Sequence, residues 1–307
     1  MQEHFHFNRP LKQVQRLFNR ILKEFNDSYK IVVPIQLRQR RNLHLQKQED
    51  TVLITIFILG KMLGFNSERM WHKFVCTNLI IEQFPERSRY HRRCKQLLQI
   101  IKLIRMRMLR HFAKESPYHI IDSMPVPLCH PVRKYRAKRL IDIADIGYCA
   151  SKQERYYGLK GSFQITAEGY IASYVISKAS IHDIRVAEEL IEQYPHPFVL
   201  ADKGYVSDDL RIRLKKQYHV NLLVEPRKNQ KIKSSKSLTS IICSKRKQIE
   251  TLFSNLVDTL KLNRNRAEPP WGFELNLEGI LLAHTFLVLW SILNGNSGHR
   301  WKEQIFN

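Results

Sequence analysis

The sequence predicts a mixed α/β protein whose first third is entirely helical. Apolar residues recur at helical spacing as far as about residue 114, and beyond residue 116 short apolar runs alternate with helical patterns. The chain has 307 residues, of which 43% are hydrophobic, so it can bury a core and wholesale disorder is excluded. We therefore expect a helical region over residues 1–115 and an α/β domain with a C-terminal helix over residues 116–307.

The helical third divides into segments bounded by polar residues and proline. Ser67 is suited to cap one helix, and Pro85 separates that helix from a long basic one. Two consecutive helices between Thr51 and Phe84 could form a helix-turn-helix. The predicted helices are Leu11–Phe25, Glu49–Leu63, Ser67–Phe84 and Glu86–Lys114.

The remaining chain alternates between strands and helices. A hairpin is indicated where two apolar runs flank Ala167-Glu168-Gly169. The predicted strands are Tyr118–Ile121, Ser162–Thr166, Tyr170–Ser177, Phe198–Ala201 and Asn221–Glu225. The predicted helices are Ile184–Tyr194, Asp208–Tyr218 and Lys245–Leu262, with a basic loop at Arg227–Ser240 and a buried apolar helix over Ile280–Leu293.

The charge balance points to a polyanionic partner. Lys and Arg number 51 and Asp and Glu 28, which gives a formal net charge of +23. Such an excess favours nucleic acid, because each cation that meets a phosphate releases a counterion. The basic residues that we expect to contact DNA are Arg92, Arg93, Arg105, Arg133, Lys134, Arg136, Arg227 and Lys228.

Cysteine usage and hydropathy exclude several other classes. The five cysteines are odd in number and none is spaced as CxxC, so neither a zinc ribbon nor a disulfide framework is expected. The first ten residues lack the apolar region of a signal peptide, and the most apolar run is too short to span a bilayer. We expect a cytoplasmic protein, associated with the nucleoid and not with a membrane.

Three carboxylates stand where catalysis could occur. Asp122 and Asp202 each follow an apolar run read as a strand, and ligands bind at strand ends in α/β sheets. Glu250 lies at the edge of the apolar stripe of its helix, one turn after Arg246. The alternatives are a turn or helix cap for each aspartate, and a plain Arg246–Glu250 ion pair for the glutamate.

Other polar residues are weaker candidates. Asp142 and Asp145 would point to opposite faces of a strand, and His182-Asp183 resembles a phosphohydrolase dyad but is better explained as a helix start. Lys160 and Lys203 could reach a phosphate from positions next to the carboxylates.

Three carboxylates without a histidine cluster suit a hard divalent cation, Mg²⁺ or Mn²⁺. Two such ions about 4 Å apart can activate water or a 3′-hydroxyl and stabilise the leaving oxygen of a phosphodiester.

Four segments of the sequence resemble bacterial insertion-sequence transposases of the DDE class, which have a ribonuclease-H-like catalytic domain. They are Ile-Ile-Asp-Ser-Met-Pro-Val-Pro at 120–127, Arg-Tyr-Tyr-Gly-Leu-Lys at 155–160, Ala-Asp-Lys-Gly-Tyr at 201–205 and Arg-Lys-Gln-Ile-Glu-Thr-Leu-Phe-Ser at 246–254. The resemblance implies a ribonuclease-H-like mixed sheet flanked by helices and preceded by the helical region.

The resemblance also implies roles for individual residues. Asp122, Asp202 and Glu250 would bind two Mg²⁺ or Mn²⁺ ions, and Arg246 matches an arginine one turn before the glutamate of the family. Many relatives have a tyrosine and a lysine where this chain has Cys243 and Val257, so roles assigned to those side chains do not carry over.

The implied activity is transposition. The enzyme would bind terminal inverted repeats, cut the ends with metal-activated water, and join the 3′-hydroxyls to target DNA, acting as a homodimer or larger assembly on double-stranded DNA. The alternatives are a nuclease or resolvase that uses the same carboxylates, and a catalytically inactive DNA-binding relative.

Overall fold

The computed structural model describes residues 11–39, 46–112, 116–137, 139–149, 152–224 and 236–302. Their packing forms two compact units, which we call the helical unit (Met1–Arg110 with Asp258–Phe286) and the sheet unit (His111–Val257 with Leu287–Asn307). Segment 258–286 therefore packs with the N-terminal helices, although it follows the α/β elements in the sequence. The expected division of the chain at residue 115 stays a prediction about folding domains.

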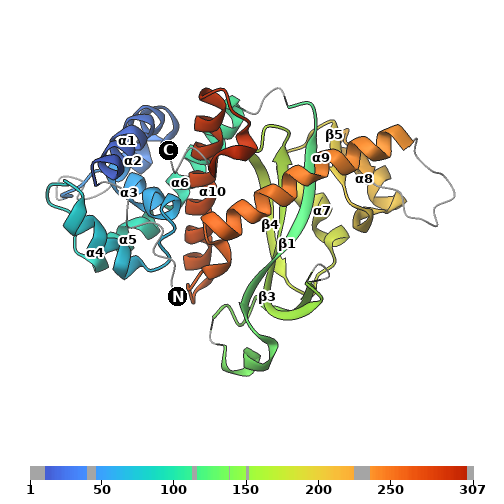
Figure 1. The fold of residues 1–307 in the computed structure, drawn as a ribbon, viewed down its shortest axis with the longest axis horizontal. Helices are drawn as coiled ribbons and strands as arrows, with labels where there is room; N and C mark the ends of the chain where they lie inside the picture. Colours follow the sequence, from blue (N-terminus) through green and yellow to red (C-terminus); the bar gives the residue numbers. More distant parts are fainter. Residues whose placement is uncertain are drawn as a thin grey trace. The chain divides into compact units, whose positions relative to one another are not determined.

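The helical unit contains the elements expected from the periodicity, with different ends. Ser67 caps α4 as predicted, because its hydroxyl accepts a hydrogen bond from the Met70 amide at 3.3 Å. The helices are α1 (Leu11–Val32), α2 (Ile35–Arg38), α3 (Asp50–Met62), α4 (Glu68–Asn78), α5 (Arg87–Gln96) and α6 (Leu98–Phe112) (Figure 1).

The prediction of a single basic helix over Glu86–Lys114 is wrong. The helix is interrupted at Leu97, whose amide bonds to the carbonyls of both Arg93 and Cys94, and α6 begins at the next residue. Such a shared bond tightens the last turn of a helix. Leu97 is fully buried, so the interruption serves packing of the core.

Two of the ion pairs among the described residues of the helical unit have a buried carboxylate, Asp50 or Glu278. Arg105 Nε lies 2.8 Å from a Glu278 carboxylate oxygen, and the two side chains are 5% and 1% exposed. Asp50 accepts from Arg93 and from the Tyr29 hydroxyl, both at 2.7 Å. Arg105 is thus a structural residue, and our expectation that it contacts DNA is wrong because its guanidinium is enclosed by the core.

Most residues of helix α10 (Pro270–Leu293) are apolar, and its acidic residues Glu274 and Glu278 are engaged in ion pairs. The helix is long and apolar enough to cross a membrane, but 89% of its most apolar stretch of 18 residues is buried inside the protein. Residues 280–291 are buried, which agrees with the prediction of a buried helix, whereas Ile292 and Leu293 at its end are exposed.

The sheet unit is built on one mixed sheet. Strand β3 (Glu154–Thr166) pairs antiparallel with β1 (His119–Cys129) along one edge. Along its other edge, the first residues of β3 pair antiparallel with β2 (Asp145–Cys149) and the later residues with β4 (Ile171–Lys178). Strand β1 also pairs parallel with β5 (Phe198–Ala201), which pairs parallel with β6 (Asn221–Val224). The β3–β4 hairpin turns at Gly169, whose φ of 101° favours glycine.

Strand β1 is longer than the sequence predicted, and Asp122 lies within it. The strand continues to Cys129 because β3 pairs with it throughout, although β5 accompanies only its first residues. Pro125 and Pro127 are two residues apart, so their backbone nitrogens point to the same edge of β1. This is the edge opposite β3, where β5 no longer pairs, so the strand loses no ladder hydrogen bond at either proline.

Helices cover both faces of the sheet. On one face α7 (Asp183–Glu192) and α8 (Asp208–Tyr218) enclose a core that includes Ile121, Val199 and Ala201. On the other face α9 (Lys236–Ser254) crosses the sheet, contacting β1 and β5 (Figure 1). Phe253 of α9 packs against Phe163 with the rings tilted by 59° and their centroids 6.0 Å apart.

The expected extents of the basic loop and the following helix need correction. Helix α9 begins at Lys236, inside the predicted loop Arg227–Ser240, and gives way to a π-helical turn at Asn255–Thr259. Residues 225–235 lie outside the described residues.

Trp301 is fully buried in the sheet unit, where the neighbouring His299 bonds to the Ala167 carbonyl at 3.0 Å.

The connectivity confirms the expected fold class. In the described residues, four antiparallel strands, β1 to β4, are followed by two parallel ones that add on the far side of β1, with helices on both faces. This arrangement is ribonuclease-H-like, and a helical region precedes it in the sequence.

The buried Arg105–Glu278 pair provides a test of the helical unit. The change Arg105→Ala should lower the free energy of unfolding by about 3–5 kcal/mol, because it leaves a carboxylate without its charge partner in the core. The double variant Arg105→Met/Glu278→Leu should recover most of that loss. Chemical denaturation measures both, and a single variant as stable as the parent would contradict the structure.

Candidate active site

Asp122 and Asp202 occupy equivalent positions on neighbouring parallel chain segments. The register pairs His119 with Val199 and Ile120 with Leu200, and continuing it by two residues sets Asp122 beside Asp202. Side chains at equivalent positions of adjacent strands share a face, with backbones about 5 Å apart. The face is that of α9, since Ile121 and Ala201 point into the core on the other side.

The surroundings of Asp122 favour its protonated form. Its Oδ1 accepts from the Ser123 amide at 2.8 Å and its Oδ2 accepts from Arg246 at 3.2 Å. The side chain is 20% exposed. The pKa of Asp122 is raised to about 6: burial is the main cause and the nearby Asp202 charge adds to it, against the opposing effects of the Ser123 amide and Arg246.

Asp202 is fixed by the turn that follows β5. Its Oδ1 accepts from the Gly204 amide at 2.7 Å, so the side chain caps a short 3₁₀ turn at Lys203–Tyr205. A Cβ at position 204 would lie 2.7 Å from that same oxygen. Only glycine therefore leaves room for the observed position of the carboxylate.

Glu250 lies one turn beyond Arg246 on α9 and is exposed, not half-buried as predicted. It borders a shallow cavity with His299, Arg300 and Lys302. The reason is the path of α9: Ile249 and Phe253 face the sheet, which turns position 250 outward. Within the described residues, no three acidic, histidine or cysteine side chains are grouped to hold one metal ion.

The structure thus brings Asp122, Asp202 and Arg246 together and leaves Glu250 outside this group. The alternative of a plain Arg246–Glu250 pair gives way to an Arg246–Asp122 pair.

Lys160 lies on the face of the sheet that α7 covers, because it is three residues from Phe163 along β3, and Phe163 faces α9. Its Nζ donates to the Ile181 carbonyl at 2.7 Å and lies 3.1 Å from Asp183 at the start of α7. The expected helix start at His182-Asp183 is confirmed, since His182 caps α7. Lys203 belongs to the turn behind Asp202.

The sequence left Tyr205 open between packing at a core edge and stacking on a base, and the structure packs it into the core next to the Asp202 turn. The side chain is fully buried, and its hydroxyl has no hydrogen-bond partner within the described residues. Burial raises the pKa of Tyr205 well above its ordinary value, and the charges of Asp183, Asp122 and Asp202 add to this effect. The only sequence signal that it lies near the site was its place in the Asp202-Lys203-Gly204-Tyr205 turn.

The basic residues proposed for DNA have different environments. Arg92, Arg133 and Arg136 are exposed and Lys134 is half-buried, with the last three on a 3₁₀ segment at Pro131–Arg136. Arg93 is 17% exposed and paired with Asp50. Arg227 and Lys228 lie outside the described residues.

The candidate site thus lies on a ribonuclease-H-like sheet, with an aspartate pair on adjacent parallel segments. Residues 115–286, more than half of the chain, match the family model for the transposase DDE domain. The chain therefore belongs to the DDE transposase family, whose members are nucleases or transferases that act on DNA and generally use divalent metal ions. Searches of curated proteins and of solved structures found no match.

The raised pKa of Asp122 predicts how stability depends on pH. The folded protein holds this proton more tightly than the unfolded chain does, since the pKa of Asp122 is about 6 against an ordinary 3.8. The free energy of unfolding of the metal-free protein should therefore fall by about 1–2 kcal/mol as pH rises from about 4 to 7.

Denaturation across this pH range would show the decline in the parent and its loss in Asp122→Asn. Asp142→Asn, which removes an exposed carboxylate, is the control and should keep the decline. An unchanged decline in Asp122→Asn would overturn the assignment.

The Tyr205 hydroxyl predicts an unusual effect of mutation. Tyr205→Phe should raise the free energy of unfolding by about 1 kcal/mol, because it removes a buried polar group that has no hydrogen-bond partner. Tyr29→Phe, which removes a donor to Asp50, should lower it by about 1 kcal/mol. If both variants lost the same free energy of unfolding, the Tyr205 hydroxyl would have to have a hydrogen-bond partner, which would contradict the structure.

Proposed function

We propose that this chain is a transposase that cuts the ends of an insertion sequence and joins them to target DNA in a reaction that depends on divalent metal. The observation that carries the proposal is the parallel register of β1 and β5, whose continuation by two residues sets Asp122 beside Asp202, and the effect of the Asp202 charge on Asp122 supports this proximity. Membership of the DDE family supports the assignment of this pair to catalysis.

The residues at the site fit a divalent cation. Asp122 and Asp202 supply oxygen ligands of the kind that Mg²⁺ and Mn²⁺ prefer, and their mutual repulsion opposes ionisation of Asp122. A bound cation would offset that repulsion and favour the charged form. Two ions, when bound, would supply the polarisation of water or a 3′-hydroxyl and stabilise the leaving oxygen.

We propose Glu250 as the third carboxylate ligand. It lies four residues beyond Arg246 on the same helix, which corresponds to a rise of about 6 Å. Arg246 already contacts Asp122, so a rotamer change or a small movement of α9 would be needed to bring Glu250 to the pair. With a cation bound, Arg246 would be available to a DNA phosphate.

The lysines contribute binding and orientation. Lys160 is held by a backbone carbonyl and by Asp183 at the start of α7, and from there it would contact a phosphate of the DNA. Lys203 would act from the turn behind Asp202. Catalysis would then depend mainly on holding the attacking oxygen and the phosphodiester in line.

The DNA partner would be the terminal inverted repeats together with target DNA. The net charge of +23 and the exposed Arg92, Arg133 and Arg136 support contacts with phosphates. Arg227 and Lys228 remain predicted contacts. Because two ends must be held together for joining, we propose that the chain acts as a homodimer or a larger assembly on DNA.

A strand-transfer assay with a precut DNA end tests this function directly. Asp202→Asn and Glu250→Gln should each lower the rate of joining by at least about a hundredfold, because each removes a charge that stabilises the transition state. Glu189→Gln, an exposed change on α7, is the matched control and should leave joining unchanged.

The outcomes separate the parts of the proposal. Cutting without any joined product from the parent would identify a nuclease instead of a transposase. Full joining by Glu250→Gln would remove Glu250 from the ligand set, and full joining by Asp202→Asn would exclude catalysis at this site. Mn²⁺ titration should show weaker binding in Asp202→Asn even where activity is not measured.

A further inference from the structure

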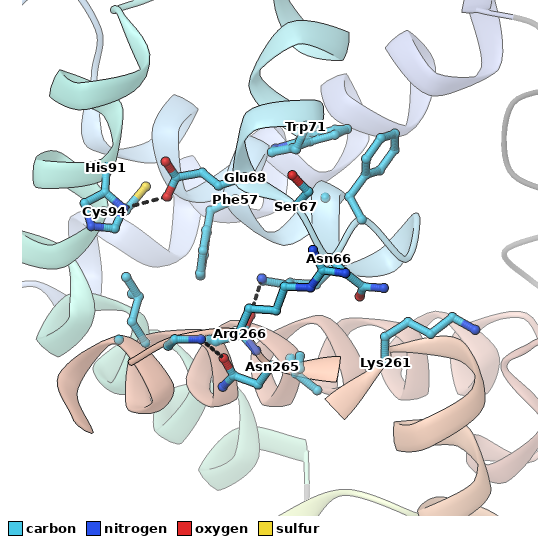
Figure 2. Close-up of a pocket in the computed structure, with 18 of the residues that line it drawn as sticks. Phe57, Asn66, Ser67, Glu68, Trp71, His91, Cys94, Lys261, Asn265 and Arg266 are labelled. Carbon is cyan, nitrogen blue, oxygen red and sulfur yellow. Dashed lines mark hydrogen bonds and ion pairs between the residues drawn. The ribbon is translucent and has the colours of Figure 1, made fainter. Parts of the chain in front are cut away.

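A cavity of about 480 Å³ lies within the helical unit, and its lining residues do not include the carboxylates of the candidate active site (Figure 2). Its walls come from α3, α4 and α5 and from the segment between Leu260 and Ile280, all within that unit. The volume is in the range of cavities that bind small ligands. Nothing in the proposed reaction uses this cavity.

Aromatic rings form much of its wall. Phe57, Phe65, Trp71 and Trp271 all border the cavity, and the rings of Phe65 and Trp71 lie 4.9 Å apart. The Lys95 ammonium lies 4.3 Å from the Trp271 ring centroid but does not line the cavity, so Trp271 presents a different part of its surface to the interior. Flat apolar walls of this kind are suited to a planar ring.

The rim of the cavity is cationic. Arg69, Arg87, Arg264 and Arg266 are exposed residues on it, and Lys261 is half-buried. The acidic residue Glu68 is engaged by His91 at 2.5 Å and by Arg87 at 3.9 Å. Figure 2 shows Arg266 and Lys261 on the side of the cavity opposite Trp71 and Ser67.

A further cation lies deeper. Lys61 lines the cavity and donates to Asn276, and burial lowers its pKa to about 8. An anionic group in the cavity would restore the charged form of this amine.

We infer that this cavity binds one unpaired nucleotide of the DNA, with its base against the aromatic walls and its phosphate among the rim cations. Stacking on aromatic side chains combined with cations along the backbone is how proteins hold single-stranded nucleic acid. The inference rests on the proposed function for its partner, DNA. An apolar peptide would leave the cationic rim unused, and a free phosphate would leave the aromatic walls unused.

The probe is a short single-stranded oligonucleotide carrying 2-aminopurine, used without divalent metal so that no chemistry occurs. Stacking should quench its fluorescence on binding. Trp271→Leu should weaken binding about tenfold and remove most of the quenching, whereas Trp271→Phe should retain both. Arg266→Gln should weaken binding with the quenching at saturation preserved.

Matched controls separate the cavity from general charge and exposed rings. Arg16→Gln removes the same charge from an exposed position on α1, and Phe198→Leu removes a ring that is 48% exposed at the start of β5. Both variants should bind the oligonucleotide and quench its fluorescence as the parent does. Thermal melting checks that each variant is folded, and Arg266→Gln replaces Trp271→Leu if the latter is not.

Photocrosslinking locates the base independently. An oligonucleotide with 5-iodouracil should crosslink to a peptide that contains Phe57, Trp71 or Trp271. Parent-like quenching in Trp271→Leu, or crosslinks only outside the cavity, would overturn the inference. Because binding is measured without metal, a failed joining assay would leave this result intact, and a failed binding assay would leave the assignment of the carboxylates intact.

Discussion

The parallel register between β1 and β5 is the constraint on which the candidate site depends. It places two aspartates, eighty positions apart in the sequence, at the same level on neighbouring segments. The pairing itself is short, and the apolar residues Ile121, Val199 and Ala201 that anchor it point into the core beneath. A slip of one residue would turn one carboxylate into that core, so the hydrophobic pattern of two strands fixes the polar site above them.

Arginine–carboxylate pairs serve two different purposes in this chain. Arg105 and Glu278 are almost fully enclosed and hold helices together. Arg246 and Asp122 are 16% and 20% exposed and lie where a ligand could compete for either partner. Both pairs have the same chemistry, and they differ in their access to water. The enclosed pair is structural, whereas a ligand can replace either partner in the exposed pair.

The sequence was sufficient for the features that depend on local pattern. The strand at Phe198–Ala201, the Ser67 cap and the turn at Gly169 were predicted because each has its own chemical signal. The burial of Arg105, the exposure of Glu250 and the interruption at Leu97 were not, because each depends on which neighbour packs against the residue. The orphaned Tyr205 hydroxyl likewise follows from packing alone.

The two prolines of β1 have a consequence for solubility. Beyond the last residue paired with β5, the outer edge of β1 pairs with no other strand of the described sheet. An open strand edge can recruit a strand from another molecule and start aggregation. Pro125 and Pro127 deprive that edge of amide donors at alternate positions, so the polypeptide can keep an extended segment beside its acidic residues without inviting self-association through backbone pairing.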